Sequence, residues 1–195
     1  MEILEIKDLE TLAKKRVPKM FFDYVNSGSW TETTYNENVS DFQKIKLRQR
    51  VAIDMSNRTL ETKMINQPVS MPVAIAPTGL TGMQRADGEI LAAQAAEEFG
   101  IPYTLSTMSV CSIEAVAEKT KKPFWFQLYV MKDKKFMERL IDRAKEAKCS
   151  ALVLTLDLQL LGQRHKDLRN GLSTPPKLIP KHIYQVLTRP MWCLR

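Results

Sequence analysis

Residues 124–156 read FWFQLYVMKDKKFMERLIDRAKEAKCSALVLTL, and this stretch decides the fold. Two short apolar runs, 124–130 and 151–156, have the length and composition of strands. Asp133 is a predicted N-cap for a helix between them that runs to about Lys148. The apolar face of this helix would consist of Phe136, Leu140, Ile141 and Ala144. The order strand, helix, strand predicts two parallel strands joined by a crossover helix.

The same pattern extends toward the N-terminus. Residues 73–76 and 103–106 are predicted strands, and residues 87–99 and 112–119 are predicted helices. Gly100 is a suitable end for the first of these helices. The apolar face of that helix would be formed by Ile90, Leu91, Ala95 and Phe99. The strands are nearly continuous apolar runs, which is typical of a parallel sheet covered on both faces. An α/β fold is therefore expected.

Two α/β architectures fit, a doubly wound sheet and a (β/α)₈ barrel. No G-x-G-x-x-G opens a helix after a strand, and no G-x-x-x-x-G-K-[ST] is present. The absence of a dinucleotide-binding turn favours the TIM barrel. Residues 71–158 would supply its first four strands and helices, or about four βα units, whereas a complete barrel has eight strands and ~250 residues. The 195 residues are therefore expected to form the first half of a barrel.

The segment before the barrel pattern is expected to be helical at first and irregular afterwards. Within residues 1–70, Asp8 is a plausible N-cap for a short helix, and a second helix would run from Pro18 to Gly28. Residues 29–70 are mixed and polar and are predicted to be irregular with short strands. The apolar face of the second helix would contain Phe21, Tyr24 and Val25.

The net charge of +7 is concentrated at the C-terminal end of the chain. Residues 159–195 hold seven Lys or Arg and one acidic residue, and they are predicted to form a basic, proline-rich loop with a short helix near 180–187. The first interpretation is a solvated loop, and the second is contact with an anionic membrane surface. Nearby apolar residues favour the second: Leu178, Ile179, Ile183 and Trp192. Nucleic acid is not an expected partner, because no binding motif accompanies the charge.

Other features of the sequence predict a cytoplasmic location. No run approaches the ~18 apolar residues of a spanning helix, and the first residues do not resemble a signal peptide. The three cysteines are too scattered for a disulfide framework or a zinc site, which favours a reducing compartment. A peripheral position at the inner face of the membrane is the alternative.

Polar side chains stand at the carboxyl ends of the predicted strands, where barrel enzymes place their chemistry. Because Gln127 and Tyr129 are two residues apart, they point to the same side of their strand. Neutral hydrogen-bonding groups suit a flat ring such as a flavin or a purine, and they do not suit a hard metal ion. The alternative is that each group caps a helix or bonds a loop backbone. The full set is Thr78, Ser106, Gln127, Tyr129, Thr155 and Asp157.

Eight short blocks stand out in the sequence: PKMFFDY at 18–24, SG at 27–28, MP at 71–72, IAPTG at 75–79, TLS at 104–106, FQLY at 126–129, LTLD at 154–157 and GQRHKDLRN at 162–170. Together they resemble the FMN-dependent 2-hydroxy-acid dehydrogenases and oxidases, the family of the L-lactate dehydrogenase and glycolate oxidase type. The resemblance covers residues 1–172 in order. Within that family the sequence is most similar to the bacterial L-lactate dehydrogenases.

The resemblance implies a barrel that holds FMN at its mouth, and it assigns roles to residues of this chain. The backbone of Pro77, Thr78 and Gly79 would line the flavin near its reactive nitrogen N5. The isoalloxazine ring would be hydrogen-bonded by Ser106, Gln127 and Thr155, which tunes the cofactor. The substrate would be held by Tyr24, Tyr129 and Arg164, since a guanidinium can bind both oxygens of a carboxylate.

The resemblance also implies a histidine base, which takes a proton from the substrate while two electrons pass to the flavin and a 2-keto acid is left. This histidine is expected beyond Arg195, because His165 and His182 do not match its motif. As part of a complete, homo-oligomeric protein, the chain would oxidise an (S)-2-hydroxy acid such as L-lactate to pyruvate, with oxygen or a membrane quinone as acceptor. The alternatives are an inactive, truncated half-barrel and a different FMN- or phosphate-binding barrel such as an isomerase.

Overall fold

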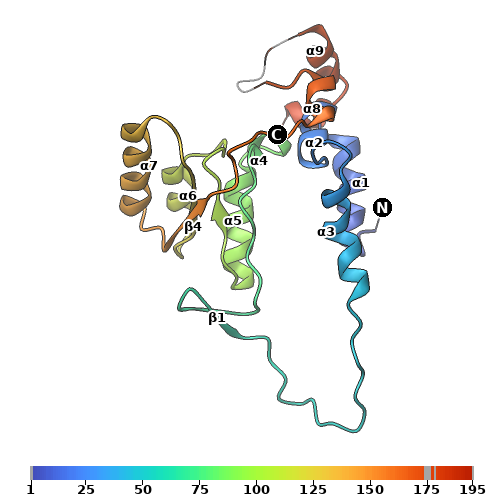
Figure 1. The fold of residues 1–195 in the computed structure, drawn as a ribbon, viewed down its shortest axis with the longest axis vertical. Coiled ribbons are helices and arrows are strands. Elements are labelled where there is room, and N and C mark those ends of the chain that lie inside the picture. The colour runs from blue at the N-terminus through green and yellow to red at the C-terminus, as the bar shows by residue number, and fades with distance from the viewer. Residues whose placement is uncertain (1, 174–176, 178, 195) are drawn as a thin grey trace. The chain divides into compact units, whose positions relative to one another are not determined.

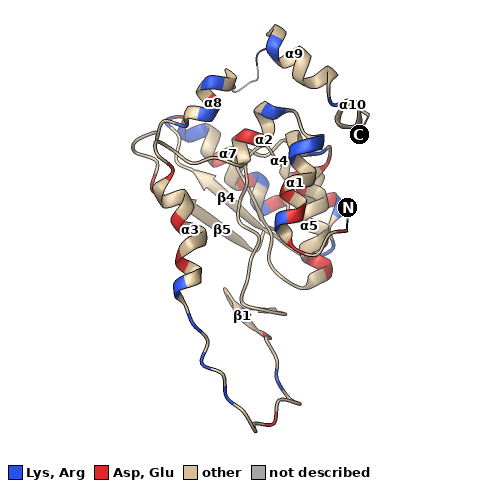
Figure 2. Cartoon of the chain, turned by 90° about the vertical axis from the view of Figure 1, so that its right-hand side faces the viewer, with Lys and Arg blue, Asp and Glu red and all other residues tan. Residues whose placement is uncertain are grey.

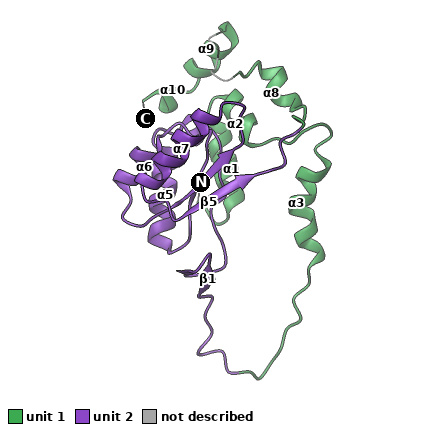
Figure 3. Ribbon diagram, turned by 60° about the vertical axis from the view of Figure 1, so that its left-hand side comes forward, with its two compact units in different colours: residues 1–53, 160–195 green, residues 54–159 purple. Residues whose placement is uncertain are grey.

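The computed structural model describes residues 2–173, 177 and 179–194 (Figure 1). The chain divides into two compact units, coloured separately in Figure 3. Residues 54–159 form one unit, and residues 1–53 together with 160–195 form the other. Each unit thus contains some of the residues that the sequence singled out, with Gln127 in the first and Arg164 in the second.

The unit of residues 54–159 is built on a parallel sheet of three strands in the order β3-β4-β5. These strands are β3 (Thr104–Leu105), β4 (Trp125–Tyr129) and β5 (Ala151–Thr155). Phe126 of β4 lies opposite Leu105 on one side and Leu152 on the other. The predicted α/β fold with parallel strands is confirmed for this part of the chain.

Three helices of this unit lie close to the ranges that the sequence predicted. They are α5 (Gly88–Phe99), α6 (Ile113–Lys119) and α7 (Lys134–Glu146). The carboxylate of Asp133 accepts a hydrogen bond of 3.0 Å from the amide of Phe136, which confirms the predicted N-cap of α7. Gly100 ends α5 with a φ of 77°, a left-handed conformation that glycine adopts without strain.

The apolar core of this unit lies between one face of the sheet and helices α5, α6 and α7, which gather on that face (Figure 3). Phe126 and Leu128 of β4 are buried there, and Leu140 and Ala144 of α7 pack against them, as predicted. Strand β5 is less covered than expected. Leu152 is 48% exposed, because β5 is an edge strand. The prediction that every strand is buried on both faces is therefore wrong for β5.

Two further expectations about this unit are wrong. Residues 73–76 form no strand: Ile75 makes a single parallel bridge with Tyr103, through two backbone hydrogen bonds of 2.9 and 3.1 Å. Pro72 and Pro77 flank this run and lack the N–H groups that would lengthen the ladder. The predicted face of α5 is correct only for Ile90, which packs against the core: Glu89, Ala93 and Ala96 are buried, whereas Leu91, Ala95 and Phe99 are exposed.

Two short antiparallel strands and a single helical turn complete the unit. The strands are β1 (Thr62–Met64) and β2 (Gln67–Val69), joined by Ile65 and Asn66 with φ angles of 47° and 61°. Positive φ at both turn residues is typical of a tight hairpin. The short strands expected within residues 29–70 are thereby confirmed. The helical turn, α4 (Thr81–Gln84), precedes α5.

The second unit is helical. Its elements are α1 (Ile6–Arg16), α2 (Lys19–Val25), α3 (Thr33–Lys44), α8 (His165–Asn170), α9 (Pro180–Leu187) and α10 (Pro190–Cys193). The helix predicted near 180–187 is confirmed as α9. Two helices were not predicted: α3 lies in a segment predicted to be irregular, and α8 lies in the predicted loop. Helix α1 begins earlier than predicted, so that Asp8 is in its first turn and accepts bonds from the amides of Leu4 and Glu5.

Helix α2 is shorter than predicted, and it buries a different face. It ends at Val25 rather than near Gly28. Met20, Phe21 and Phe22 are buried, whereas Val25 is exposed and Tyr24 is half-buried. The ring of Phe21 stacks on Trp192 of α10, with 5.5 Å between the ring centres. The predicted face of Phe21, Tyr24 and Val25 is therefore correct only for Phe21.

Candidate functional site

Gln127 is the centre of a polar network at the carboxyl ends of β3, β4 and β5. Its side chain is 1% exposed. The amide oxygen Oε1 accepts hydrogen bonds from the Ser106 hydroxyl at 3.3 Å and from the Thr107 backbone N–H at 3.2 Å. The amide nitrogen Nε2 donates to the Thr155 hydroxyl at 2.7 Å. The structure therefore brings Ser106, Gln127 and Thr155, which belong to three successive strand ends, into one hydrogen-bonded group.

Thr107 belongs to this network and was not singled out from the sequence. Its hydroxyl donates to the backbone oxygen of Gln127 at 2.5 Å and accepts from the Tyr129 N–H at 3.3 Å. The signal in the sequence was the pair of adjacent hydroxyl residues, Ser106 and Thr107, directly after a buried strand. Thr107 thus fastens the loop after β3 to the backbone of β4.

A hollow of about 400 Å³ adjoins the ends of β4 and β5. Tyr129 and Thr155 line it, so two of the predicted site residues border the same space. The other lining residues are Val130, Leu156, Leu158 and Gln159. Asp157, which the sequence also placed at this strand end, is exposed.

The segment predicted to line a flavin lies between residue 75 and α4. Pro77 and Thr78 are exposed, and Gly79 is half-buried. The Thr78 hydroxyl donates to the backbone oxygen of Ala76 at 3.4 Å, so the side chain turns back on its own loop. The next residue after this segment, Leu80, donates its N–H to the backbone oxygen of Met108 at 2.9 Å. This bond connects the segment to the loop that follows β3.

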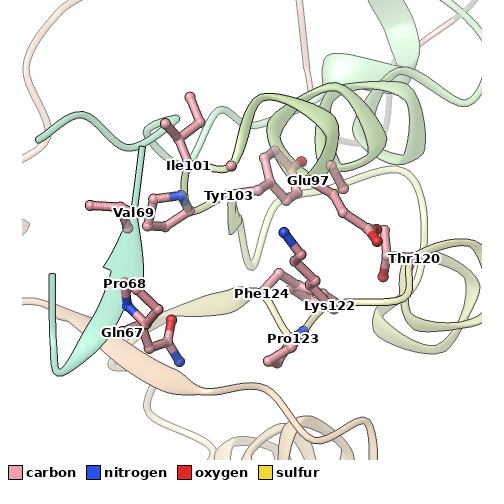
Figure 4. A pocket seen from close by; sticks show the side chains of 13 residues that line it. Gln67, Pro68, Val69, Glu97, Ile101, Tyr103, Thr120, Lys122, Pro123 and Phe124 are labelled. Carbon is pink, nitrogen blue, oxygen red and sulfur yellow. The ribbon is translucent and has the colours of Figure 1, made fainter. Parts of the chain in front are cut away.

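Another hollow of the same unit, of about 280 Å³, lies at the opposite ends of the strands. Figure 4 shows Tyr103, Phe124 and Lys122 around it, and these residues lie at or before the first residues of β3 and β4. In barrel enzymes the amino ends of the strands contribute to stability, and the carboxyl ends carry the chemistry. The hollow in Figure 4 is therefore a weaker candidate for the reaction site than the surroundings of Gln127.

In the other unit, Arg164 is held against Tyr24. The guanidinium carbon lies 4.7 Å from the centre of the Tyr24 ring, a cation–π distance. Its Nη2 donates to the backbone oxygen of Tyr24 and, at 3.0 Å, to the Ser27 hydroxyl. The Nε atom lies 3.0 Å from a carboxylate oxygen of Asp167. Two of the three predicted substrate residues, Tyr24 and Arg164, are thus brought together.

A second carboxylate, that of Asp23, acts electrostatically on Asp167. Asp23, which is buried, accepts a bond of 2.7 Å from the side-chain amide of Asn170 on α8 and pairs with Lys19. Burial raises the pKa of Asp167 above its usual value, Arg164 acts in the opposite direction, and Asp23 adds a smaller upward effect. The cation of Arg164 therefore lies beside a carboxylate that is partly removed from water.

The two histidines have contacts that suit structural roles. His182 is fully buried, and its Nδ1 and Nε2 atoms lie 2.6 Å and 2.8 Å from the backbone oxygens of Lys177 and Asn170. The rings of His165 and Trp30 pack edge to face, with 5.9 Å between the ring centres. His182 thus joins α9 to α8.

The donor set around Gln127 fits the polar edge of a flavin ring. Ser106, Thr107 and Thr155 supply hydroxyl groups, and Gln127 supplies an amide, so the group can both donate and accept. The set contains no carboxylate that would repel a ring gaining negative charge on reduction.

Comparisons with known proteins agree with this chemistry. The family model of the FMN-dependent dehydrogenases matches residues 13–195. The L-lactate dehydrogenases of Acinetobacter baylyi strain ADP1 and Acinetobacter baumannii strain AYE are 46% and 47% identical over 98% and 95% of this chain. The chain spans about half the length of these curated relatives, 50% and 48%.

Solved structures show the same likeness. The monotopic membrane protein (S)-mandelate dehydrogenase matches 100% of this chain and 52% of its own, with a TM-score of 0.92 and 33% identity. A lactate oxidase of Pediococcus acidilactici, described as putative in its crystal structure, matches 91% of this chain and 50% of its own, with a TM-score of 0.84 and 31% identity. With a family model that matches almost its whole length, this chain belongs to the FMN-dependent dehydrogenases.

Proposed function

We propose that the complete protein oxidises a 2-hydroxy acid, L-lactate above all, to the 2-keto acid, and that this chain provides one part of the flavin and substrate site. The observation that carries the proposal is the group around Gln127, in which three successive strand ends are joined. The relatives named above support the choice of substrate, since they are L-lactate dehydrogenases. The accompanying fold would be the first half of a (β/α)₈ barrel, with the bridge at Ile75 marking the place of its first strand.

In this proposal the residues near Gln127 bind the flavin ring. FMN, when bound, accepts the two electrons that leave the substrate. Ser106, Gln127 and Thr155 would hydrogen-bond the polar edge of the ring, and the backbone of residues 77–79 would lie along it. Because Gln127 is held by hydrogen bonds to protein groups, little conformational entropy would be lost on binding.

Tyr24, Tyr129 and Arg164 would orient the substrate. Arg164 would attract the carboxylate, and its bonds to Tyr24 and Ser27 would fix the direction in which the guanidinium points. The Tyr129 hydroxyl would reach the substrate from the hollow at the end of β4. We assign the proton-accepting base to neither His165 nor His182. Neither histidine matches the motif of the base, and His182 is also fully buried between backbone oxygens.

The test is to add FMN to the 195-residue chain, remove the excess, and record the visible spectrum with and without L-lactate, using D-lactate as the control. Retained flavin that stays oxidised with both isomers is the expected result, since this chain would supply the proposed flavin contacts and the base is assigned to neither of its histidines. Bleaching by L-lactate alone would show a complete site and overturn the assignment of the base. If no flavin is retained, the proposal that these residues bind FMN by themselves is wrong.

We also propose that helix α9 and its surroundings contact a membrane surface, where a quinone could serve as acceptor. Helix α9 buries polar His182 and Gln185 and exposes apolar or aromatic residues on its other side. Exposed apolar or aromatic side chains here include Ile183, Tyr184 and Leu187 of α9, Met191 of α10, and Leu194, which directly follows α10. Lys181 lies on the same helix, among the basic residues that Figure 2 marks in blue. Of the residues suggested by the sequence for this role, Leu178 lies outside the described part of the chain.

This contact is tested by sedimentation with lipid vesicles. A surface that combines exposed apolar side chains with Lys and Arg should favour anionic over neutral vesicles. The solved neighbour described as a monotopic membrane protein supports the idea. Within the described residues, none of the helices is both long and apolar enough to span a bilayer. We expect the double variant Ile183→Ser, Leu187→Ser to lose binding, and equal binding of the variant would contradict the proposal.

A further inference from the structure

Glu89 is an acidic side chain with no exposed surface. It lies in the first turn of α5, where a carboxylate is favoured by the helix dipole. In addition to the helix dipole, Glu89 has specific hydrogen-bond partners. The Oε1 atom accepts the N–H of Gly82 at 3.0 Å and the N–H of Val110 at 2.9 Å. One carboxylate oxygen therefore joins two loops that are far apart in the sequence.

Both loops continue directly from predicted flavin contacts. Gly82 lies in α4, just after Pro77, Thr78 and Gly79, and Val110 lies in the loop that begins with Ser106. The two loops also touch at Gly82, where an added Cβ would come within 2.7 Å of the Val110 Cβ and 3.0 Å of the second Glu89 oxygen. The bond between Leu80 and Met108 runs between the same two loops. The loops are thus closely packed around the carboxylate.

The charge of Glu89 is compensated inside the protein. Burial raises its pKa, but the N–H groups of Val110 and Gly82 act in the opposite direction, and the net pKa lies below the usual value. Burial, followed by hydrogen bonding to Glu89, raises the pKa of the Cys111 thiol to about 11, so the thiol stays protonated beside the carboxylate. Hydrogen bonds to an ionised acceptor are about twice as strong as neutral ones.

We propose that Glu89 is a positioning residue for the flavin site: its carboxylate holds the loop of residues 77–84 against the loop of residues 106–111, so that both present their flavin contacts together. This inference rests on the proposed function for the identity of the ligand. The joining of the loops does not depend on the ligand, and it can be measured without one. Glu89 acts through the backbone of these loops and is not itself a contact of the ring.

The experiment measures amide hydrogen exchange of the 195-residue chain, with and without FMN, in Glu89→Ala and Glu89→Gln. The alanine variant leaves the N–H groups of Gly82 and Val110 without their acceptor, so we expect exchange in both loops to rise by at least about 10-fold. Glutamine keeps the accepting oxygen without the charge, so it should restore most of the protection. Affinity for FMN should fall by about 10-fold in the alanine variant and less in the glutamine variant, with the spectrum of the bound flavin altered in the former.

Glu97 provides the matched control. It lies on the same helix, and its carboxylate also accepts one backbone N–H, that of Lys121 at 2.9 Å, but away from both loops. Glu97→Ala should leave the exchange of Gly82 and Val110 and the flavin spectrum unchanged.

The inference is overturned if Glu89→Ala exchanges like the native chain at Gly82 and Val110. It is also overturned if exchange rises equally in β4 and β5, since Glu89 would then support the whole unit. If the native chain retains no FMN, the proposed function fails for this chain, and the exchange data still decide whether Glu89 joins the loops.

Discussion

Replacement of Gln127 by leucine gives the sharpest test of the network at the strand ends. The two side chains are similar in size, so the change removes hydrogen bonds without opening a large cavity. Three bonds disappear: those from Ser106 and Thr107 to Oε1, and that from Nε2 to Thr155. The Thr107 N–H is then left without its acceptor, because its backbone position is fixed by the bond from its own hydroxyl to the oxygen of residue 127.

The expected cost follows from these contacts. A buried N–H without a partner costs about 1–3 kcal/mol. The hydroxyls of Ser106 and Thr155 can rotate toward other acceptors or water, so they add little, and leucine recovers part of the cost through apolar contact. We therefore expect the free energy of unfolding to fall by about 2 kcal/mol. Affinity for FMN should fall as well, because the ring contacts lose their common support.

Urea denaturation followed by circular dichroism measures the change. With a slope of about 2 kcal/mol per molar urea, the midpoint should fall by roughly 1 M. Gln94→Leu is the control, since Gln94 is exposed and makes a single bond of 3.0 Å to the oxygen of Lys119. It should change the stability by less than about 0.5 kcal/mol. If Gln127→Leu is as stable as this control, the network around Gln127 does not contribute as described.

Three further predictions concern other parts of the chain. Arg143, through its hydrogen bonds to Glu114, lowers the pKa of that carboxyl to about 2. The pair therefore stabilises the fold fully above about pH 4.5, and this contribution is lost as the pH falls toward 2. Because the pair is largely exposed, the contribution is at most about 1 kcal/mol. Arg143→Met should return the Glu114 titration, followed by NMR, to its usual range, and an unchanged titration would exclude Arg143 as the cause. Asp133→Ala removes the N-cap of α7 and should lower the unfolding free energy by about 1 kcal/mol, whereas Asp133→Asn should retain most of it. His182→Leu removes the contacts of the ring nitrogens with the backbone oxygens of Lys177 and Asn170, so trypsin should cleave near α9 at least about 10-fold faster, and an unchanged rate would contradict its role in holding that helix.

The strands and helices around β4 were predictable because local and long-range signals agree there. The run at 124–130 is apolar, its neighbours carry capping residues, and both flanking strands pair with it. Residues 73–76 carry a similar local signal but form only a bridge, since a strand needs backbone partners as well as composition. Helix α3 shows the opposite case. Its Tyr35, Val39 and Phe42 have helical spacing, but they stand among polar residues and none of the helix is buried, so the sequence pattern there predicts an irregular segment.

The candidate site was predictable to the extent that alternation along a strand determines which side chains share a side. Gln127 points away from the apolar core that contains Phe126 and Leu128, as predicted. The bonding of Glu89 was not predictable, because an acid in the first turn of a helix is common and usually exposed. Its partners are backbone N–H groups, which leave no trace in side-chain composition. The sequence pattern likewise gave no sign that Arg164 would contact the backbone of Tyr24.

The alternation along β4 also limits how the length of this chain can change during evolution. Phe126 and Leu128 belong to the apolar core, and Gln127 between them belongs to the polar network. One residue inserted within β4, between Trp125 and Phe126, would reverse the two sets, placing an amide in the core and a phenyl ring in the polar network. Insertions within β4 should therefore be absent in functional homologues, whereas the exposed residues on either side of the strand, 121–123 and those after Tyr129, can accept them. The number of residues in β4 is thus constrained as strongly as the identity of its side chains.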